Sequence, residues 1–148
     1  ARGNHKDANW RFPKGAVEGK VGAVKNIYFS NIQCTGENGV YVSAESKDKI
    51  SNVVFDNVSI FIDKTTSHQG GIYDRRPADM EGFVKGSTSG FYFDSAEKIK
   101  IQNCSVEWGK NRPDYFAYAV ESKNVDSLII NNLEGESAFS DKLKAVKK

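Results

Sequence analysis

The chain has 148 residues, of which 39% are hydrophobic and 27% are charged, and its formal net charge is +2. This composition is typical of one globular domain with a real core, and it excludes a disordered chain. The small net charge gives no reason to expect a nucleic-acid or membrane-surface partner. No apolar run reaches the length of about 18 residues that would predict a membrane-spanning helix.

Residues 1–23 are predominantly polar, and we expect an irregular lead-in there. They contain no secretory signal peptide, because residues 1–10 have no apolar stretch. Across the chain, Pro is scarce, Gly is plentiful, and Val, Ile, Phe and Tyr are frequent, which indicates β structure.

Four segments share a pattern in which apolar residues alternate up to an asparagine and resume one residue out of phase after it. They are VKNIYFSNIQC, ISNVVFDNVSI, AEKIKIQNCSV and VDSLIINNLEG, with the asparagines Asn31, Asn57, Asn103 and Asn132. A strand that faces a core cannot change phase without turning a corner. Asparagine tolerates the left-handed conformation that suits such a corner. Each segment therefore predicts a strand, an asparagine bend and a second strand.

The four asparagines are separated by 26, 46 and 29 residues. Repeats of about 20 to 50 residues are typical of solenoids, and the period-2 alternation excludes helical repeats. We therefore expect an all-β, right-handed, single-stranded parallel β-helix of about three to four coils over residues 24–136. In it, the asparagines would form an inward polar ladder, each amide hydrogen-bonding to its neighbours.

A third strand in each coil is predicted by NGVYVSAE (38–45), SGFYFDSAE (89–97) and AYAVES (117–122). The side chains expected to point inward are Val40, Val42, Phe91, Phe93, Tyr118 and Val120. Those expected to point outward are Tyr41, Ser43, Tyr92, Asp94, Ala119 and Glu121. The 46-residue gap could hold two coils, but PADMEGFVKGSTS has no asparagine motif, which favours one coil with a loop excursion near 64–89. Residues 137–148 predict a tail or a capping helix, with Phe139, Leu143 and Val146 over the last coil.

The segments VKNIYFSNI and ISNVVFDNV resemble the right-handed, pectin lyase-like β-helix of pectin-active enzymes, most closely polygalacturonase-like proteins of glycoside hydrolase family 28. GGIYDRRP and VEWGKNRPDYFAYAVES resemble segments of the same proteins. The resemblance covers residues 24–136 and implies the C-terminal part of a secreted or periplasmic enzyme that degrades acidic plant polysaccharide. The Asn-Thr-Asp, Asp-Asp, Gly-His-Gly and Arg-Ile-Lys motifs of that family are absent. We therefore expect this chain alone to be inactive; the alternative is a non-catalytic carbohydrate-binding or structural β-helix.

Two carboxylates are weak catalytic candidates. Asp94 and Glu121 are expected at equivalent outward positions of adjacent coils, with their carboxyl groups about 5 Å apart, as in retaining glycosidases. Two like charges that close would raise one pKa and supply an acid beside a base. In the alternative interpretation, both are surface carboxylates paired with Arg75, Arg76 or lysines.

Aromatic and cationic side chains supply candidate groups for binding a sugar. Aromatic rings stack on sugar faces, and arginines bind uronate carboxylates through two hydrogen bonds. The candidates are Tyr41, Tyr73, Arg75, Arg76, Tyr92 and Trp108. Alternatively, Tyr73 packs the excursion onto the coils, Arg75 pairs with an aspartate, and Trp108 seals a loop.

Nothing in the sequence predicts a metal or another cofactor. His5 and His68 stand alone, and the two cysteines lie far from metal-ligand spacing. We expect Cys34 and Cys104 to be buried thiols, and we interpret the glycosylation patterns at Asn57 and Asn103 as unused, because both asparagines are expected to face inward. An uncovered first coil would expose a strand edge, so we expect either missing sequence before it or self-association through the ends.

Overall fold

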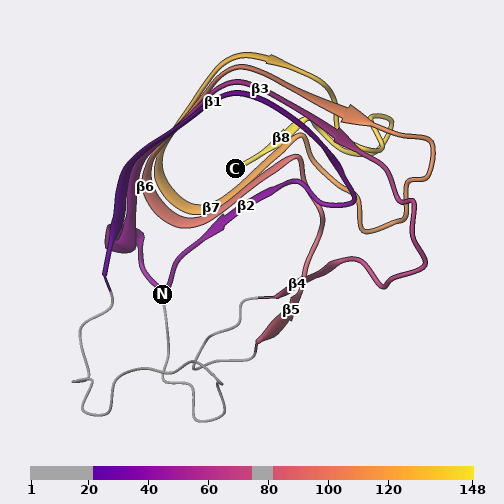
Figure 1. Ribbon diagram of the computed structural model, residues 1–148, viewed down its shortest axis with the longest axis horizontal. Coiled ribbons are helices and arrows are strands. Elements are labelled where there is room, and N and C mark those ends of the chain that lie inside the picture. Colours follow the sequence, from indigo (N-terminus) through magenta and orange to yellow (C-terminus); the bar gives the residue numbers. More distant parts are fainter. Residues whose placement is uncertain (1–21, 75–81) are drawn as a thin grey trace.

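The computed structural model describes residues 22–74 and 82–148 (Figure 1). The predicted lead-in therefore lies outside the described residues, except for Gly22 and Ala23, and so do Arg75 and Arg76. In chain order the elements are β1 (Val24–Gly36), β2 (Val40–Ser43), the 3-10 helix η1 (Lys47–Lys49), β3 (Ile50–Ile62), β4 (Ile72–Asp74), β5 (Phe83–Lys85), β6 (Phe91–Trp108), β7 (Val120–Glu134) and β8 (Val146–Lys147). Within these described ranges η1 is the only helical element, which confirms the all-β prediction.

The main sheet is parallel and stacks the chain in layers. Its strand order is β1-β3-β6-β7-β8, and β2 pairs with the beginning of β6. We number the layers along the chain: β1 is layer 1, β2 and β3 form layer 2, β6 is layer 3, β7 is layer 4, and β8 begins layer 5. Figure 1 shows these strands following nested curved paths. The predicted parallel stacking of the repeated segments is confirmed.

The four predicted bends are also confirmed, because the asparagines adopt left-handed backbone conformations. The φ angles are 55° at Asn31 and Asn57, and 52° at Asn103 and Asn132. A second set of left-handed residues, which the sequence analysis missed, gives each layer another bend: Asn26, Asn52, Ser95 and Asn124. Left-handed backbone is unfavourable for most residues but accessible to asparagine.

The core consists of columns of apolar side chains from successive layers. In β3 the buried residues are Val53 and Phe55 before the bend and Val58 and Ile60 after it, so the phase changes at Asn57 as predicted. The partners of these residues in β6 are equally buried: Ile99, Ile101, Cys104 and Val106. The third-strand prediction is confirmed at Phe91 and Phe93, which are fully buried. Burial of one such side chain stabilises the fold by about 1.5–3 kcal/mol.

The predicted inward orientation of the asparagine ladder is wrong, because all four asparagines are exposed. The residues on either side of the phase change, Phe55 and Val58, both face the core, so Asp56 and Asn57 between them must face outward. The ladder bonds themselves exist: Nδ2 of Asn57 donates to Oδ1 of Asn31 at 2.7 Å.

The ladder is nevertheless interrupted between layers 2 and 3. Nδ2 of Asn132 donates to Oδ1 of Asn103 at 3.1 Å. Asn103 itself donates to the carboxylate of Asp56, also at 3.1 Å, and not to Asn57. The ladder is therefore a surface feature whose members also have access to water.

The register predicted for residues 117–122 is wrong by two positions. Val120, not Tyr118, lies opposite Phe91. Ala119 was expected to point outward but is fully buried, whereas Tyr118 is only partly buried and its ring lies under the Lys147 ammonium at 5.1 Å. Phe91 and Val120 each precede their bend asparagine by 12 residues, and this shared spacing would have given the correct alignment.

Between β3 and β6 the chain leaves the stack. β3 pairs directly with β6, so the described residues between them, 63–74 and 82–90, add no layer to the main sheet. Instead, β4 and β5 pair with each other as a small antiparallel sheet. Glu37, in the turn after β1, anchors the start of this excursion: its carboxylate accepts hydrogen bonds from Nζ of Lys64 at 2.6 Å and the backbone N of Thr65 at 2.8 Å.

Residues 137–148 form turns and β8, not a capping helix. The backbone N of Leu143 donates to the carbonyl of Phe139 at 2.8 Å, which closes one turn. Val146 of β8 then lies opposite Val120 of β7. Ala138 is buried, and Phe139 and Val146 pack against the core. This segment therefore covers part of the core beneath layer 4.

We predict that substitutions at Asn57 separate the backbone requirement from the ladder bond. Asn57→Gly keeps the left-handed conformation and loses the bond to Asn31, whereas Asn57→Ala loses both. The glycine variant should therefore be the more stable of the two by about 1 kcal/mol, with both below wild type. Urea denaturation measures this order. At Ser59, in ordinary strand conformation, glycine should be less stable than alanine; the same order at both positions would contradict the bend.

We also predict an acid-dependent role for Glu37. The hydrogen bond from Lys64, helped by the backbone N–H groups of Thr65 and Thr66, lowers the pKa of Glu37 from 4.5 to about 2. A lowered folded-state pKa contributes stability above pH 4.5, and this contribution is lost as the pH falls towards 2. Glu37→Gln should therefore lower the melting temperature at pH 7, with a difference from wild type that shrinks below pH 4.5. The same substitution at the exposed Glu107 is the control, and a pH-independent difference would contradict the prediction.

Candidate functional site

Three predicted site residues, Tyr41, Tyr73 and Tyr92, meet on one face. Tyr41 of β2 lies opposite Tyr92 of β6, and their rings stack 5.1 Å apart at 4°. Tyr73 of β4 brings its ring to 4.1 Å from that of Tyr41. The parallel register thus places identical side chains above one another, and the excursion adds the third ring.

Tyr73 is engaged in packing the excursion onto the layers. Its hydroxyl donates to the carbonyl of Ser87 at 2.6 Å. A β carbon at Gly86 would lie 3.2 Å from the ring, so the chain passes close to it. Burial raises the pKa of Tyr73 to about 12, so the hydroxyl remains protonated at neutral pH. This geometry favours the structural interpretation of Tyr73 over a sugar platform.

Glu121 is buried and fully occupied by donors. Its carboxylate accepts hydrogen bonds from Oγ of Ser87 at 2.8 Å and Oγ of Ser89 at 2.9 Å. Nζ of Lys147 donates at 2.9 Å. Burial acts to raise the pKa of Glu121, but the bonds from Lys147 and the two serines outweigh it and hold the pKa below its ordinary value. Glu121 is therefore ionised at neutral pH and cannot serve as a general acid.

The predicted equivalence of Asp94 and Glu121 is wrong. Glu121 lies opposite Tyr92, and Asp94 lies opposite Lys123, two residues further along the strand. Two residues of strand span about 7 Å, in addition to the spacing between layers. Asp94 instead accepts a hydrogen bond from Oγ of Ser95 at 3.0 Å. The closely spaced carboxyl pair of a retaining glycosidase is therefore not formed by these residues.

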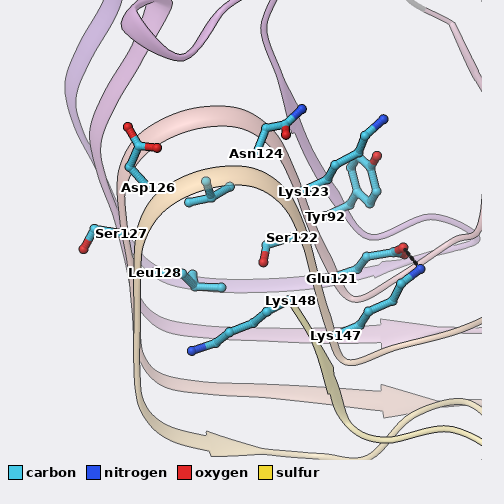
Figure 2. A pocket seen from close by; sticks show the side chains of 11 residues that line it. Tyr92, Glu121, Ser122, Lys123, Asn124, Asp126, Ser127, Leu128, Lys147 and Lys148 are labelled. Carbon is cyan, nitrogen blue, oxygen red and sulfur yellow. Dashed lines mark hydrogen bonds and ion pairs between the residues drawn. The ribbon is translucent and has the colours of Figure 1, made fainter.

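A concavity of about 700 Å³ lies beside the first part of β7 and the end of β8 (Figure 2). Figure 2 shows Tyr92, Lys123 and the Glu121–Lys147 pair towards one end of it, and Asp126, Ser127 and Leu128 towards the other. Lys148 extends across it. Tyr92 and Glu121 were among the predicted site residues, but the lysines were not, because no local motif places the C-terminal residues beside β7.

Some charged side chains around the concavity form ion pairs, and two of the lysines do not. Asp126 pairs with Lys47 of η1, and Lys147 pairs with Glu121. Lys123 and Lys148, in contrast, form no ion pair with a carboxylate among residues 22–74 and 82–148. The concavity therefore presents two cations that form no ion pair with a described carboxylate, and Lys123 is the one at the same end as Tyr92 (Figure 2).

Trp108 lies apart from the tyrosines, at the far end of β6. Its indole Nε1 donates to the carbonyl of Glu136 at 2.8 Å, and its ring lies 5.4 Å from that of Phe116. With Phe61 and Lys110 it borders a second, shallow concavity. Trp108 thus holds the segment after β7 in place, as the alternative interpretation expected.

The cysteines do not behave alike. Cys104 is buried, and burial raises its thiol pKa. Cys34 is exposed, contrary to the prediction, because it belongs to layer 1, on which the described residues stack no further layer. Asn57 and Asn103 are exposed as well, so an inward orientation does not exclude their glycosylation, again contrary to the prediction.

Within the described ranges, no group of three or more His, Cys, Asp or Glu residues is arranged to hold a metal ion. None of the described helices is long and apolar enough to cross a membrane. No protein family, curated protein or solved structure matches the chain.

We predict that Glu121 and Lys147 are energetically coupled. Glu121→Gln removes the charge that Lys147 neutralises, and Lys147→Met leaves a buried carboxylate with only its two serine donors. Each substitution should lower the unfolding free energy by about 1–3 kcal/mol. The double variant should lose less than the sum, which denaturant unfolding of all four proteins measures. Additive losses would contradict the coupling.

Proposed function

We propose that the chain forms a short right-handed parallel β-helix. The support is the parallel register of the repeated strands and the left-handed bends at equivalent positions of each layer. Right-handed crossovers account for about 98% of connections between parallel strands of one sheet. The likeness of the asparagine-bend segments to pectin-active β-helices points in the same direction.

We further propose that this β-helix binds acidic polysaccharide without cleaving it, as part of an exported protein that acts on plant-type glycans. The observation that carries this proposal is the concavity that Tyr92, Lys123 and Lys148 line, with Lys123 at the same end as Tyr92 (Figure 2). A half-buried aromatic ring offers an apolar surface for a sugar, and ammonium groups attract uronate carboxylates. The described residues alone supply this combination; Arg75 and Arg76 are not needed for it.

Cleavage is disfavoured by the state of the carboxylates. Glu121 is ionised and holds three donors, and Asp94 stands two residues out of register with it. Glycoside hydrolysis needs one protonated carboxyl group at the leaving oxygen and a second carboxylate across the bond. The second candidate is a fragment of a glycosidase whose catalytic residues lie elsewhere in a longer protein. In that case this chain would bind the polysaccharide in the same way, and the longer protein would cleave it.

We predict weak binding that depends on charge. The concavity is shallow and few sugar units can contact it, so a dissociation constant of about 1 mM is expected for trigalacturonate. Lys123→Gln should weaken binding several-fold, whereas Lys110→Gln, at the other concavity, should leave it unchanged. Chemical-shift titration in dilute protein measures both, with a neutral galactan trisaccharide as the control ligand.

The outcomes are distinct. Equal affinity for the charged and neutral trisaccharides would refute the uronate preference. Release of reducing ends from polygalacturonate, abolished by Asp94→Asn or Glu121→Gln, would show that the chain is itself an enzyme.

A further inference from the structure

Among the described residues, layer 1 presents a strand edge that pairs with no other strand. β1 pairs with β3 along one edge, and no described strand pairs with the other. Apolar side chains in its core columns are consequently exposed: Phe29 is 39% exposed, whereas its partner Phe55 in layer 2 is 3% exposed. Val24 is 54% exposed. An unprotected edge of this kind is a template for another strand.

The asparagine side chains of successive layers donate their hydrogen bonds in one direction, so the two ends of the stack differ. Each ladder side chain donates to the layer before it: Asn52 to Asn26, Asn57 to Asn31, and Asn132 to Asn103. Asn31 therefore accepts through Oδ1, and its own Nδ2 donates to no described acceptor. At the opposite end Asn132 donates through Nδ2, and its Oδ1 accepts from no described donor. One end of the stack offers donors, and the other end offers acceptors.

At the other end of the stack, β8 covers only the beginning of the β7 edge. β8 pairs with β7 only at Val120 and Glu121, so the rest of the β7 edge is open among the described residues. The concavity of about 700 Å³ lies along this edge and is bordered by residues 121–128 of β7. Among the described residues, layer 5 thus has a strand opposite the first part of β7 and none opposite the second, and layer 1 has the second part, β1, without a described first part. A strand added in the register of the other layers would begin opposite Val125, at the end of the concavity that residues 125–128 line.

We propose that copies of this chain stack end to end, with β1 of one copy adding to the β7 edge of the next as a parallel strand. Extending the observed registers places Asn31 of the added copy opposite Asn132, so that its free Nδ2 meets the free Oδ1. β8 of one copy and β1 of the other then form one complete layer.

The side chains along this register match. Phe29 of the added copy falls opposite Ile130, and its Val24 opposite Val125, which continues both apolar columns. Its Lys25 falls one residue further along, opposite Asp126. That aspartate already binds Lys47 and lies at an exposed position, so a second cation adds a favourable contact. Apolar, amide and charged positions therefore agree in a single register.

Such an interface is heterologous, because it joins two different surfaces of the same chain. Heterologous contacts that do not close into a ring produce open assemblies. Parallel stacking adds about 4.8 Å per layer with little rotation, so the assembly should grow along the stacking axis and not stop at a dimer.

Cysteine pairs test the register directly. In the register proposed, Ser30 lies opposite Asn131 of the neighbouring copy, whereas within one copy the two are three layers apart, about 14 Å. A disulfide requires Cα atoms within about 7 Å, so S30C/N131C in a Cys34→Ser background can close only between copies. Mild oxidation should give a ladder of covalent multiples on non-reducing gels, and sedimentation of the wild-type chain should show a mass that rises with concentration.

The matched control is S30C/E134C in the same background. Glu134 lies opposite Gln33, about 10 Å along the strand from position 30, and should not cross-link. Equal ladders from both pairs would overturn the register. Covalent dimers from S30C alone, with no larger species, would mean that two β1 edges meet each other, and a monomer at every concentration would mean that no second copy adds; each result would overturn the proposal.

Discussion

The left-handed backbone at the asparagine bends is the constraint on which the rest of the structure depends. A single residue at φ near 55° lets the apolar alternation change phase, so that one strand lines the core on both sides of a corner. Because Asn31, Asn57, Asn103 and Asn132 turn at the same point of each layer, the strands on either side remain in register. That register in turn aligns the apolar columns and places Tyr41 over Tyr92. Local conformation therefore sets both the core and the face on which the tyrosines meet.

The two proposed partners share the concavity beside β7. A uronate beside Tyr92 and Lys123 would lie at one end of it, and β1 of a second copy, which begins opposite Val125, would cover the other end. Both partners would bind near the point where β8 ends at Lys147. Backbone and cationic groups of the β7 edge have no described neighbour there. Stacking would therefore cover the end of the concavity at residues 125–128 in all copies except the one at the end of an assembly.

Features that follow from the local alternation of apolar and polar residues were predictable from the sequence. Features that depend on contacts between distant segments were not. The four bends and the buried columns were recoverable, because period-2 patterns and asparagine spacing mark them directly. The outward orientation of Asn57 was missed, although the two inward residues flanking the bend imply it. The predicted register of Glu121 was wrong because AYAVES was aligned with SGFYFDSAE by its aromatic residue. Alignment by the equal distances from Phe91 to Asn103 and from Val120 to Asn132 gives the observed register. The lysines of the candidate site come from the C-terminal residues, whose return to β7 no local pattern records.

Electrostatics decides which groups at the concavity can bind an anion. Glu121 draws together three segments distant in sequence, since Ser87 and Ser89 reach it from the excursion and Lys147 from β8. An acidic sugar at Lys147 would have to displace or face that carboxylate, and the two negative charges would repel each other in a partly buried setting. Lys147 thus binds the Glu121 carboxylate, and in the proposed site the affinity for an anion would come from Lys123 and Lys148. The carboxylate first considered for catalysis would then repel an acidic ligand and leave it to the lysines that it does not neutralise.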